Sequence, residues 1–384
     1  MRFEFATAGR IVFGPGVSAE LAKIAMSYGR RVFVVTGRDK IRRAGMVADL
    51  EAAGCTCRLF GVPGEPTVDL VREGAEALRL FAPNVVVAIG GGSAIDAGKA
   101  IAALGANPDD VLEYLEIVGR GRPLPNRPVP FIAVPTTAGT GSEVTRNAVL
   151  GVPEHGVKAS LRSPSMLPAV ALVDPDLTLG LSREITAATG LDALTQLIEP
   201  FVCNRANPMT DSLCRDGIAM VSAALPKVCA NGRDAESRAA MSYGSLLGGI
   251  ALANAGLGVV HGFAAPIGGM FPAPHGAVCA ALLPYGMAAN VRALRERDPE
   301  GLALEKYSEI AKIVTGYPDA EAEAGAEWAW RLVQGSGIPP LRTYGISNAD
   351  VAGLVEKASH ASSMKANPVR LTADELARVL GSAI

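Results

Sequence analysis

The sequence predicts an α/β nucleotide-binding domain with a Rossmann-like parallel sheet, followed by a second domain built of helices alone. Up to about residue 180, short apolar β-branched runs alternate with amphipathic stretches, which is typical of a parallel sheet covered by helices. Two of these runs lead directly into loops rich in glycine or hydroxyl side chains. From SREITAATG onwards, alanine- and leucine-rich segments with helical spacing replace the strands. We therefore expect a nucleotide-binding domain over 1–181 and a helical domain over 182–384.

The elements of the first domain follow from the spacing of their apolar residues. Residues 2–13 alternate in polarity, which favours a strand. The sequence FGPG at 13–16 then predicts a turn. The runs VFVVT and VVVAIG are continuous and apolar, as strands buried on both faces are. In chain order we expect strands over 2–13, 32–36, 56–60, 84–90 and 130–137, helices over 18–28, 44–53 and 68–81, and a further helix after the GGGS at 90–93.

The strand predicted over 84–90 runs into a glycine-rich turn that opens a helix. Gly91, Gly92 and Ser93 lie at this turn, and Asp96 lies on the helix that follows. Glycine lets backbone N–H groups close on a phosphate, and a helix N-terminus favours negative charge. A tight turn that needs glycine's freedom for its own sake is an equally good explanation of this loop alone.

A second loop strengthens the phosphate hypothesis. The strand PFIAVPTT ends in AGTGSEVT, which places the hydroxyls of Thr136, Thr137, Thr140 and Ser142 at or just beyond the carboxyl end of a strand. Open α/β sheets bind their ligands at that edge. Two such loops favour a pyrophosphate, and hence a dinucleotide.

The second half of the chain is predicted to be helical. Ser182 is a suitable N-cap for a helix that carries Glu184 in its first turn. We expect helices over 183–201, 207–229, 233–253, 258–268, 275–291, 301–315, 320–335, 347–359 and 372–381.

Candidate metal ligands lie within these helices. His261 and His275 form twin His-Gly pairs in a segment of otherwise small or apolar residues, and upstream Asp192 and Gln196 stand four residues apart, on one face of a helix. Two imidazoles, a carboxylate and an amide carbonyl would make a ligand set for Zn²⁺ or Fe²⁺. Either histidine alone could instead be a structural residue that is satisfied by a backbone carbonyl. Since the phosphate loops lie in the first domain, we expect the site in the crevice between the domains.

The composition excludes several other classes of function. A net charge of −2 provides no broad field for nucleic acid or anionic lipid. The six cysteines lack the paired spacing of a zinc ribbon, which suits reduced thiols in the cytoplasm. The N-terminus lacks a signal-peptide pattern, and no apolar run of about eighteen residues is free of charges and turn-formers, so we expect no membrane span.

Four motifs together resemble the iron-containing, or group III, alcohol dehydrogenases. GGGSAIDAGK, PTTAGTGSE, GLDALTQLIE and the HG-x12-HG stretch occur in that order over nearly the whole chain. The resemblance implies a dehydroquinate-synthase-like fold and NAD(P)-linked interconversion of an alcohol and a carbonyl compound, with a homo-oligomer, such as a homodimer, as the usual assembly. It implies that Asp192, His261 and His275 are metal ligands, and that Lys158 lies near the nicotinamide ribose.

The chain departs from the family pattern at four places, one of which, Glu65 in place of an asparagine, is assigned no role. The fourth ligand, normally a histidine, is Gln196, whose neutral carbonyl is a weaker donor than imidazole. Ala265 replaces a histidine that many relatives carry, so a proton relay through that position is absent or rerouted. Gly37, followed by Arg38, replaces an aspartate that would bind the ribose 2′-hydroxyl of NAD, which favours NADP without excluding NAD.

These features predict a metal-dependent alcohol dehydrogenase or carbonyl reductase. Hydride would pass between C4 of the nicotinamide and a metal-bound alcohol, aldehyde or ketone, with Fe²⁺ or Zn²⁺ as the ion. Three alternatives remain open at this stage: a metal-free reductase of the maleylacetate type, a lyase or cyclase on the same fold, and a nucleotide-binding protein without catalysis. The sequence does not identify the substrate.

Overall fold

The computed structural model describes residues 2–37 and 41–384, and the chain separates into two compact units. The sheet unit consists of Ala6–Thr137 and Gly141–Thr178. The helical unit consists of Leu179–Ile384, the N-terminal residues as far as Phe5, and the short segment Ala138–Thr140. We had expected a single boundary between residues 181 and 182.

The sheet unit contains a six-stranded sheet in which every neighbouring pair is parallel, in the order β1-β8-β5-β4-β2-β3. The predicted parallel sheet is therefore confirmed. Its strands are β1 (Ile11–Phe13), β2 (Arg31–Thr36), β3 (Thr56–Gly61), β4 (Val85–Gly90), β5 (Phe131–Pro135) and β8 (Val170–Val173). The helices between them are α1 (Leu21–Met26), α2 (Ile41–Ala52), α3 (Val68–Phe81), α4 (Gly92–Gly105) and the short α5 (Val111–Tyr114).

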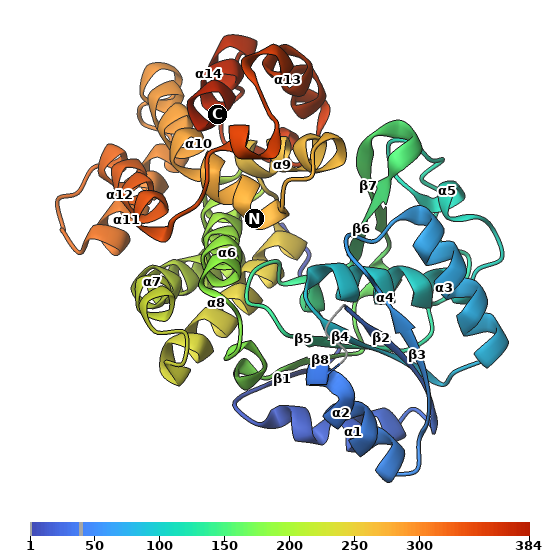
Figure 1. Cartoon of the computed structure of the whole chain (residues 1–384). Coiled ribbons are helices and arrows are strands. Elements are labelled where there is room, and N and C mark those ends of the chain that lie inside the picture. The colour runs from blue at the N-terminus through green and yellow to red at the C-terminus, as the bar shows by residue number, and fades with distance from the viewer. Residues whose placement is uncertain (1, 38–40) are drawn as a thin grey trace. The chain divides into compact units, whose positions relative to one another are not determined.

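Helices cover both faces of this sheet because its central strands are apolar on both sides. Phe33 and Val35 of β2 pack in a core with α3 and α4, whereas Val32 and Val34 pack in a second core with α1 and α2. Figure 1 shows the two pairs of helices on opposite sides of the strands. A continuous apolar run thus predicted a strand that is buried on both faces.

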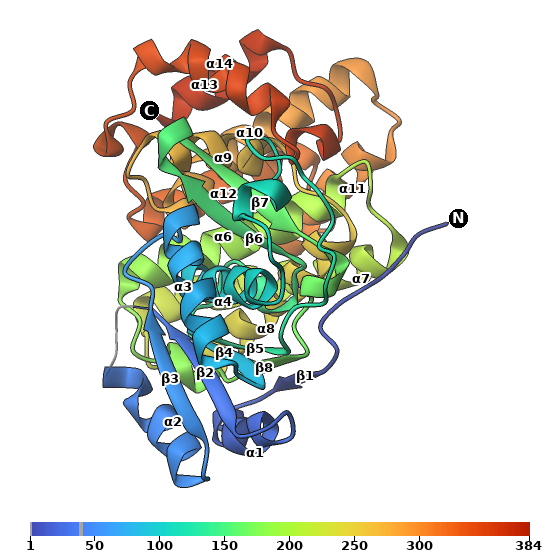
Figure 2. The ribbon, with the colours of Figure 1, turned by 90° about the vertical axis from the view of Figure 1, so that its right-hand side faces the viewer.

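The sheet unit differs from the expectation at its start and near its end. The strand predicted over 2–13 is only Ile11–Phe13, because only these residues pair with β8. We did not predict the antiparallel hairpin of β6 (Asn147–Val152) and β7 (Val157–Arg162), which packs against α4 (Figure 2). Its strands alternate half-buried and buried residues, a pattern that we did not assign to strands in a segment also rich in turn-formers.

The helical unit contains nine α-helices, and each lies where the sequence predicted one, with ends shifted by up to six residues. No strand lies among residues 179–384, all of which the structure describes. The helices are α6 (Arg183–Val202), α7 (Pro208–Ala230), α8 (Ala235–Asn254), α9 (Val259–Met270), α10 (His275–Arg297), α11 (Leu302–Thr315), α12 (Ala322–Ser336), α13 (Val351–His360) and α14 (Ala373–Ala383).

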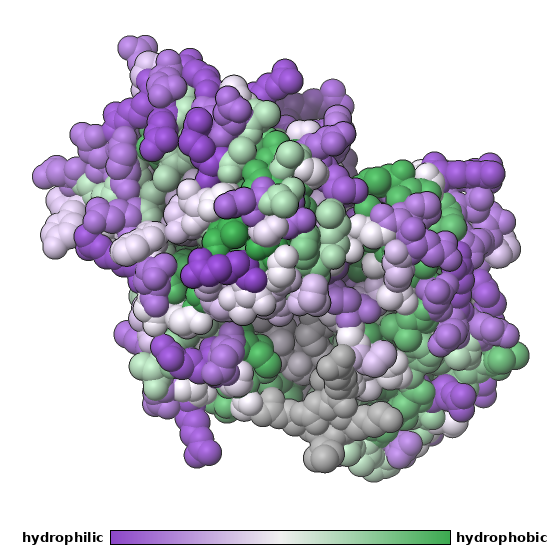
Figure 3. Space-filling model, turned by 45° about the horizontal axis from the view of Figure 1, so that its top comes forward, coloured by the Kyte–Doolittle hydropathy of each residue, from purple (hydrophilic) through white to green (hydrophobic). Residues whose placement is uncertain are grey.

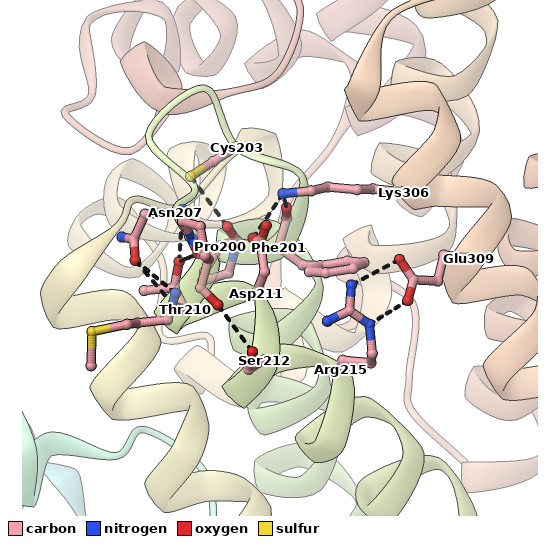
Figure 4. A network of polar contacts seen from close by, with 12 residues as sticks. Pro200, Phe201, Cys203, Asn207, Thr210, Asp211, Ser212, Arg215, Lys306 and Glu309 are labelled. Carbon is pink, nitrogen blue, oxygen red and sulfur yellow. Dashed lines mark hydrogen bonds and ion pairs between the residues drawn. The ribbon is translucent and has the colours of Figure 1, made fainter. Parts of the chain in front are cut away.

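Helix α6 is central to this unit, and polar contacts fix both of its ends. At its start, the Ser182 side chain accepts a hydrogen bond from the backbone N–H of Ile185, as expected of an N-cap. At its end, Lys306 of α11 donates to the carbonyl of Phe201 (2.8 Å) and forms an ion pair with Asp211 of α7 (2.7 Å). Figure 4 shows how these contacts join three helices around the last turn of α6.

Helix α10 is long and apolar enough to cross a membrane by length and composition, as is the bent pair of α8 and α9. However, 78% of the apolar window of α10 is buried within the protein, which is typical of a core helix. Figure 3 shows one face of the molecule, on which hydrophilic residues, coloured purple, are widespread and smaller hydrophobic areas, in green, lie between them. The expected absence of a membrane span stays a prediction.

Candidate active site

The two predicted phosphate loops lie side by side at the carboxyl edge of the sheet. Strands β4 and β5 are neighbours, and the backbone N–H of Thr136 donates to the carbonyl of Gly90 (2.9 Å). A methyl group at Gly91 would lie 3.3 Å from the Thr137 side chain, so the loops are in direct contact. Gly92 and Ser93 form the first turn of α4. Exposed N–H groups of a helix start therefore lie beside threonine hydroxyls, an arrangement that suits a phosphate.

Asp96 connects the second loop to helix α4, the helix that follows the first loop. Its carboxylate accepts hydrogen bonds from the Ser142 hydroxyl and from the backbone N–H of Val149 (2.9 Å). Lys99, which is buried, lies 3.3 Å from the same carboxylate and donates to the carbonyl of Ser142 (2.9 Å). Asp96 and Ser142 therefore bind each other within the sheet unit, and their contact supports the second loop.

Three further residues were predicted to bind the cofactor: Gly37, Arg38 and Lys158. Gly37 follows β2, whose carboxyl end lies next to that of β4, so it lies at the same edge of the sheet. Arg38 lies outside the described residues. Lys158 lies on β7 rather than in a loop; its side chain is 8% exposed and forms an ion pair with Glu65 (3.3 Å). Its place near the nicotinamide ribose stays a prediction.

The structure brings three predicted metal ligands together within the helical unit. Asp192 lies in the middle of α6, His261 in the first half of α9, and His275 at the first position of α10. Gly276 makes the approach of α10 to α6 possible, because a methyl group there would lie 2.6 Å from the backbone carbonyl of Ala188. In the second His-Gly pair, His275 is therefore the predicted ligand, and Gly276 allows α10 to contact α6 closely.

The distances among these side chains fit a metal ion better than they fit hydrogen bonds. Asp192 Oδ1 lies 3.4 Å from His261 Nε2 and 3.5 Å from His275 Nε2. Oxygen and nitrogen ligands about 2.1 Å from a tetrahedral ion lie about 3.4 Å apart. Asp192 Oδ1 and His261 Nε2 are buried and have no hydrogen-bond partner among the described residues. Two buried polar atoms that face each other without partners require an explanation, and a shared cation supplies one.

Glu199, seven residues after Asp192 on α6, sets the orientation of His261. Its carboxylate contacts His261 Nδ1 (2.7 Å) and accepts a hydrogen bond from the backbone N–H of Val260 (2.7 Å). A proton on Nδ1 leaves the lone pair of Nε2 facing Asp192, which is the usual arrangement behind a metal-bound histidine. Glu199 was not among the predicted site residues, although its spacing of two helical turns from Asp192 places it on the same face of α6.

The electrostatics of the cluster favour positive charge. Burial by itself would lower the pKa of His261, but Cys279 and the carboxylates of Asp192 and Glu199 outweigh it and raise that pKa well above its usual value. For His275, burial is likewise outweighed by Cys279 and Asp192, and the pKa rises to about 9. Burial would raise the pKa of Asp192, yet the neighbouring imidazoles lower it. A divalent cation would supply the same positive charge and release the protons.

Two side chains are candidates for the fourth position of the cluster, the predicted Gln196 and a cysteine. The side-chain amide nitrogen of Gln196 donates to the carbonyl of Thr140 (2.7 Å). Four potential ligand atoms lie within 4.8 Å of one another, and the fourth residue among them is Cys279. Its Sγ lies 3.6 Å from His275 Nε2. Cys279 was not among the predicted ligands, although it follows His275 by four residues on a predicted helix.

Comparisons with known proteins identify the family of this chain. Residues 8–175 match the family described as "Iron-containing alcohol dehydrogenase", and residues 186–384 match "Fe-containing alcohol dehydrogenase family, C-terminal". The chain is 36% identical to alcohol dehydrogenase 4 of Schizosaccharomyces pombe, over 97% of this chain and 87% of that protein. It is 34% identical to lactaldehyde reductase of Escherichia coli, over 97% of both chains.

Solved structures show the same fold. A crystal structure of 1,3-propanediol oxidoreductase superposes with a TM-score of 0.91 at 32% identity, with both chains covered completely. An alcohol dehydrogenase from Oenococcus oeni gives the same TM-score, identity and coverage. The chain therefore belongs to the iron-containing alcohol dehydrogenase family, and it is a metal-dependent, NAD-linked alcohol dehydrogenase or carbonyl reductase.

Proposed function

We propose that Asp192, His261 and His275 hold the catalytic divalent cation, Fe²⁺ or Zn²⁺, and that this site reduces small aldehydes and ketones or oxidises the matching alcohols. The observation that carries the proposal is the pair of buried, unpartnered atoms, Asp192 Oδ1 and His261 Nε2, at 3.4 Å from each other. Carboxylate and neutral imidazole are ligands that both ions accept.

The protein side chains hold the site rigid and leave one side of it open. A divalent cation in such a site supplies Lewis-acid polarisation of an alcohol or carbonyl oxygen. Asp192 and His261 are almost fully buried, whereas the His275 side chain is 35% exposed, so substrate reaches the site from the side of His275. Glu199 keeps the proton of His261 on Nδ1, away from the reacting atoms. Ala265 cannot take part in proton transfer, so the proton moves by another route.

The nicotinamide cofactor binds at the carboxyl edge of the sheet in this proposal. Gly91, Gly92 and Ser93 hold the pyrophosphate through backbone N–H groups, and Thr136 and Thr137 bind beside them. Thr140 and Ser142 continue this loop, with Asp96 supporting Ser142. We assign a preference for NADP over NAD, because Gly37 presents no carboxylate to a ribose 2′-phosphate and Arg38 follows it in the sequence. Lys158 keeps its proposed place near the nicotinamide ribose, although its ion pair with Glu65 competes with that role.

The names of the relatives support a class of substrate. Similar proteins are named 1,3-propanediol dehydrogenase, from Klebsiella pneumoniae, and lactaldehyde reductase, from Escherichia coli. We therefore propose a short-chain alcohol or hydroxyaldehyde for this chain. We further propose a cytoplasmic homodimer. The six cysteines of the chain are all free, which suits a reducing compartment such as the cytoplasm. Light scattering in solution would measure the molar mass and so test the dimer.

One set of assays tests the function. Purified protein is analysed for bound metal, then assayed with lactaldehyde, other short aldehydes, ketones and oxoacids, with NADPH and with NADH, before and after chelation. We expect activity that chelation removes and that Zn²⁺ or Fe²⁺ restores. The Asp192→Asn variant should retain neither metal nor turnover. Full activity in the chelated protein or in this variant would overturn the proposed role of the metal.

A further inference from the structure

We propose that Cys279 is the fourth protein ligand of the metal, in place of the imidazole that position 196 lacks. This inference rests on the proposed metal site. The ligand set would then be one carboxylate, two imidazoles and one thiolate, from Asp192, His261, His275 and Cys279. A substrate oxygen would enter as a fifth ligand, an expansion that catalytic zinc sites allow.

The position of the sulfur matches that of a ligand. For a tetrahedral ion, a sulfur ligand at about 2.3 Å and a nitrogen ligand at about 2.1 Å lie about 3.6 Å apart. Cys279 Sγ and His275 Nε2 are separated by 3.6 Å. Each of the four residues offers one atom to a group that spans no more than 4.8 Å, so a single ion can reach all of them.

The helix that carries His275 also carries Cys279, which explains how the two side chains meet. Residues four apart on α10 project from the same side of the helix, one turn from each other. Gly276 lies between them and brings that side of the helix against the backbone of α6 at Ala188. Cys279 is fully buried, so its sulfur faces the interior of the unit rather than solvent.

Gln196 is a poorer candidate for the same position. Its amide nitrogen is fixed by donation to the Thr140 carbonyl, and its carbonyl oxygen is a harder and weaker donor than a thiolate.

A thiolate ligand changes the choice of metal. Metal binding would release the thiol proton to solvent as the metal–sulfur bond forms, because a coordinated thiol is deprotonated. Soft sulfur ligands favour Zn²⁺ over harder ions such as Mn²⁺ and Mg²⁺, and over Fe²⁺ to a smaller degree. We therefore expect this chain to prefer Zn²⁺ more strongly than a three-histidine site would.

Cobalt substitution tests the sulfur ligand directly. The full chain is stripped of metal with a chelator and titrated with Co²⁺, and its absorption spectrum is recorded. We expect a near-ultraviolet sulfur-to-cobalt charge-transfer band at one Co²⁺ per chain. The band should be absent from Cys279→Ser and present in Cys214→Ser, which removes another fully buried cysteine of the same unit.

Metal affinity gives a second measurement that does not depend on activity. Loss of a residue that hydrogen-bonds to a metal ligand lowers metal affinity about 10- to 100-fold. Loss of a ligand itself should cost more, so we expect the Zn²⁺ affinity of Cys279→Ser to fall at least about 100-fold. Gln196→His in that background should restore part of the affinity without restoring the charge-transfer band. Circular dichroism confirms that each variant is folded.

The outcomes separate this inference from the proposed function. Stoichiometric Co²⁺ binding without the band in the parent chain would overturn the thiolate ligand and leave the three-ligand site intact. It would also assign the 3.6 Å contact to a simple thiol–imidazole hydrogen bond. No binding of Co²⁺ or Zn²⁺ at all would overturn both proposals.

Discussion

At the scale of single residues, the carboxylate behind His261 should control how tightly the metal binds. Glu199 accepts from two donors, His261 Nδ1 and the backbone N–H of Val260. In Glu199→Gln, the amide can satisfy only one of them through its oxygen, so the imidazole loses its fixed tautomer. We expect Zn²⁺ affinity to fall about 10- to 100-fold, measured by competition with a chromogenic chelator. Glu327→Gln, at an exposed ion pair on α12, is the matched control. Equal affinities in the two variants would contradict this role.

Gly37 should decide the choice between the two nicotinamide cofactors. A carboxylate at this position would accept hydrogen bonds from the ribose hydroxyls of NADH and repel the 2′-phosphate of NADPH. A hydrogen bond to a charged group contributes about 1.5–3 kcal/mol, so Gly37→Asp should shift the ratio of kcat/KM for NADPH over NADH by about 10- to 100-fold towards NADH. Gly61→Asp, at the end of the neighbouring strand β3, controls for added charge. An unchanged ratio in Gly37→Asp would place cofactor selection elsewhere.

At the scale of elements, the loop after β5 carries a buried acid whose ionisation should weaken the fold. Burial raises the pKa of Glu143 to about 7, and the nearby Lys99 only partly opposes this effect. The unfolded chain loses this proton near pH 4.5, whereas the folded protein retains it up to about pH 7. The stabilisation from the bound proton is therefore complete below pH 4.5 and lost as the pH rises through 7.

The Glu143→Gln variant, which cannot ionise at this position, should escape that loss. Between pH 4.5 and 7.5, the free energy of unfolding of the parent should fall relative to the variant by at most about 3 kcal/mol, measured by urea unfolding. Glu76→Gln, on the exposed side of α3, should show a constant difference from the parent. A constant difference for Glu143→Gln as well would show that this carboxyl does not retain its proton.

The elements also show what could and could not be predicted from the sequence. Helical spacing was enough to place Asp192 and Gln196 on one face of a helix, whereas the approach of Asp192 to the two histidines was inferred from ligand chemistry and from the family resemblance. Cys279 obeys the same spacing from His275, but a lone buried cysteine is usually a packing residue, and only the coordinates show its sulfur among the ligands. The hairpin β6–β7 was missed because its stability comes from contacts with α4, which lie far away in the sequence.

At the scale of the whole molecule, the metal should act as a cross-link within the helical unit. Its proposed ligands come from α6, α9 and α10, so the bound ion joins α6 to two consecutive helices that lie more than fifty residues further along the chain. Both tryptophans of the chain, Trp328 and Trp330, lie on α12 of the same unit. Tryptophan fluorescence therefore reports the unfolding of this unit in the complete protein.

Zinc should raise the thermal midpoint that this fluorescence reports. A ligand at 1,000 times its Kd stabilises the folded state by about 4 kcal/mol, and each kcal/mol raises the midpoint of a unit of this size by about 2–4 °C. We expect a shift of about 8–16 °C between chelated and zinc-loaded protein, and almost none in Asp192→Asn. A bound nucleotide does not need these ligands, so NADPH should still protect the Asp192→Asn variant from proteolysis. An equal zinc shift in parent and variant would mean that the stabilising ion binds elsewhere.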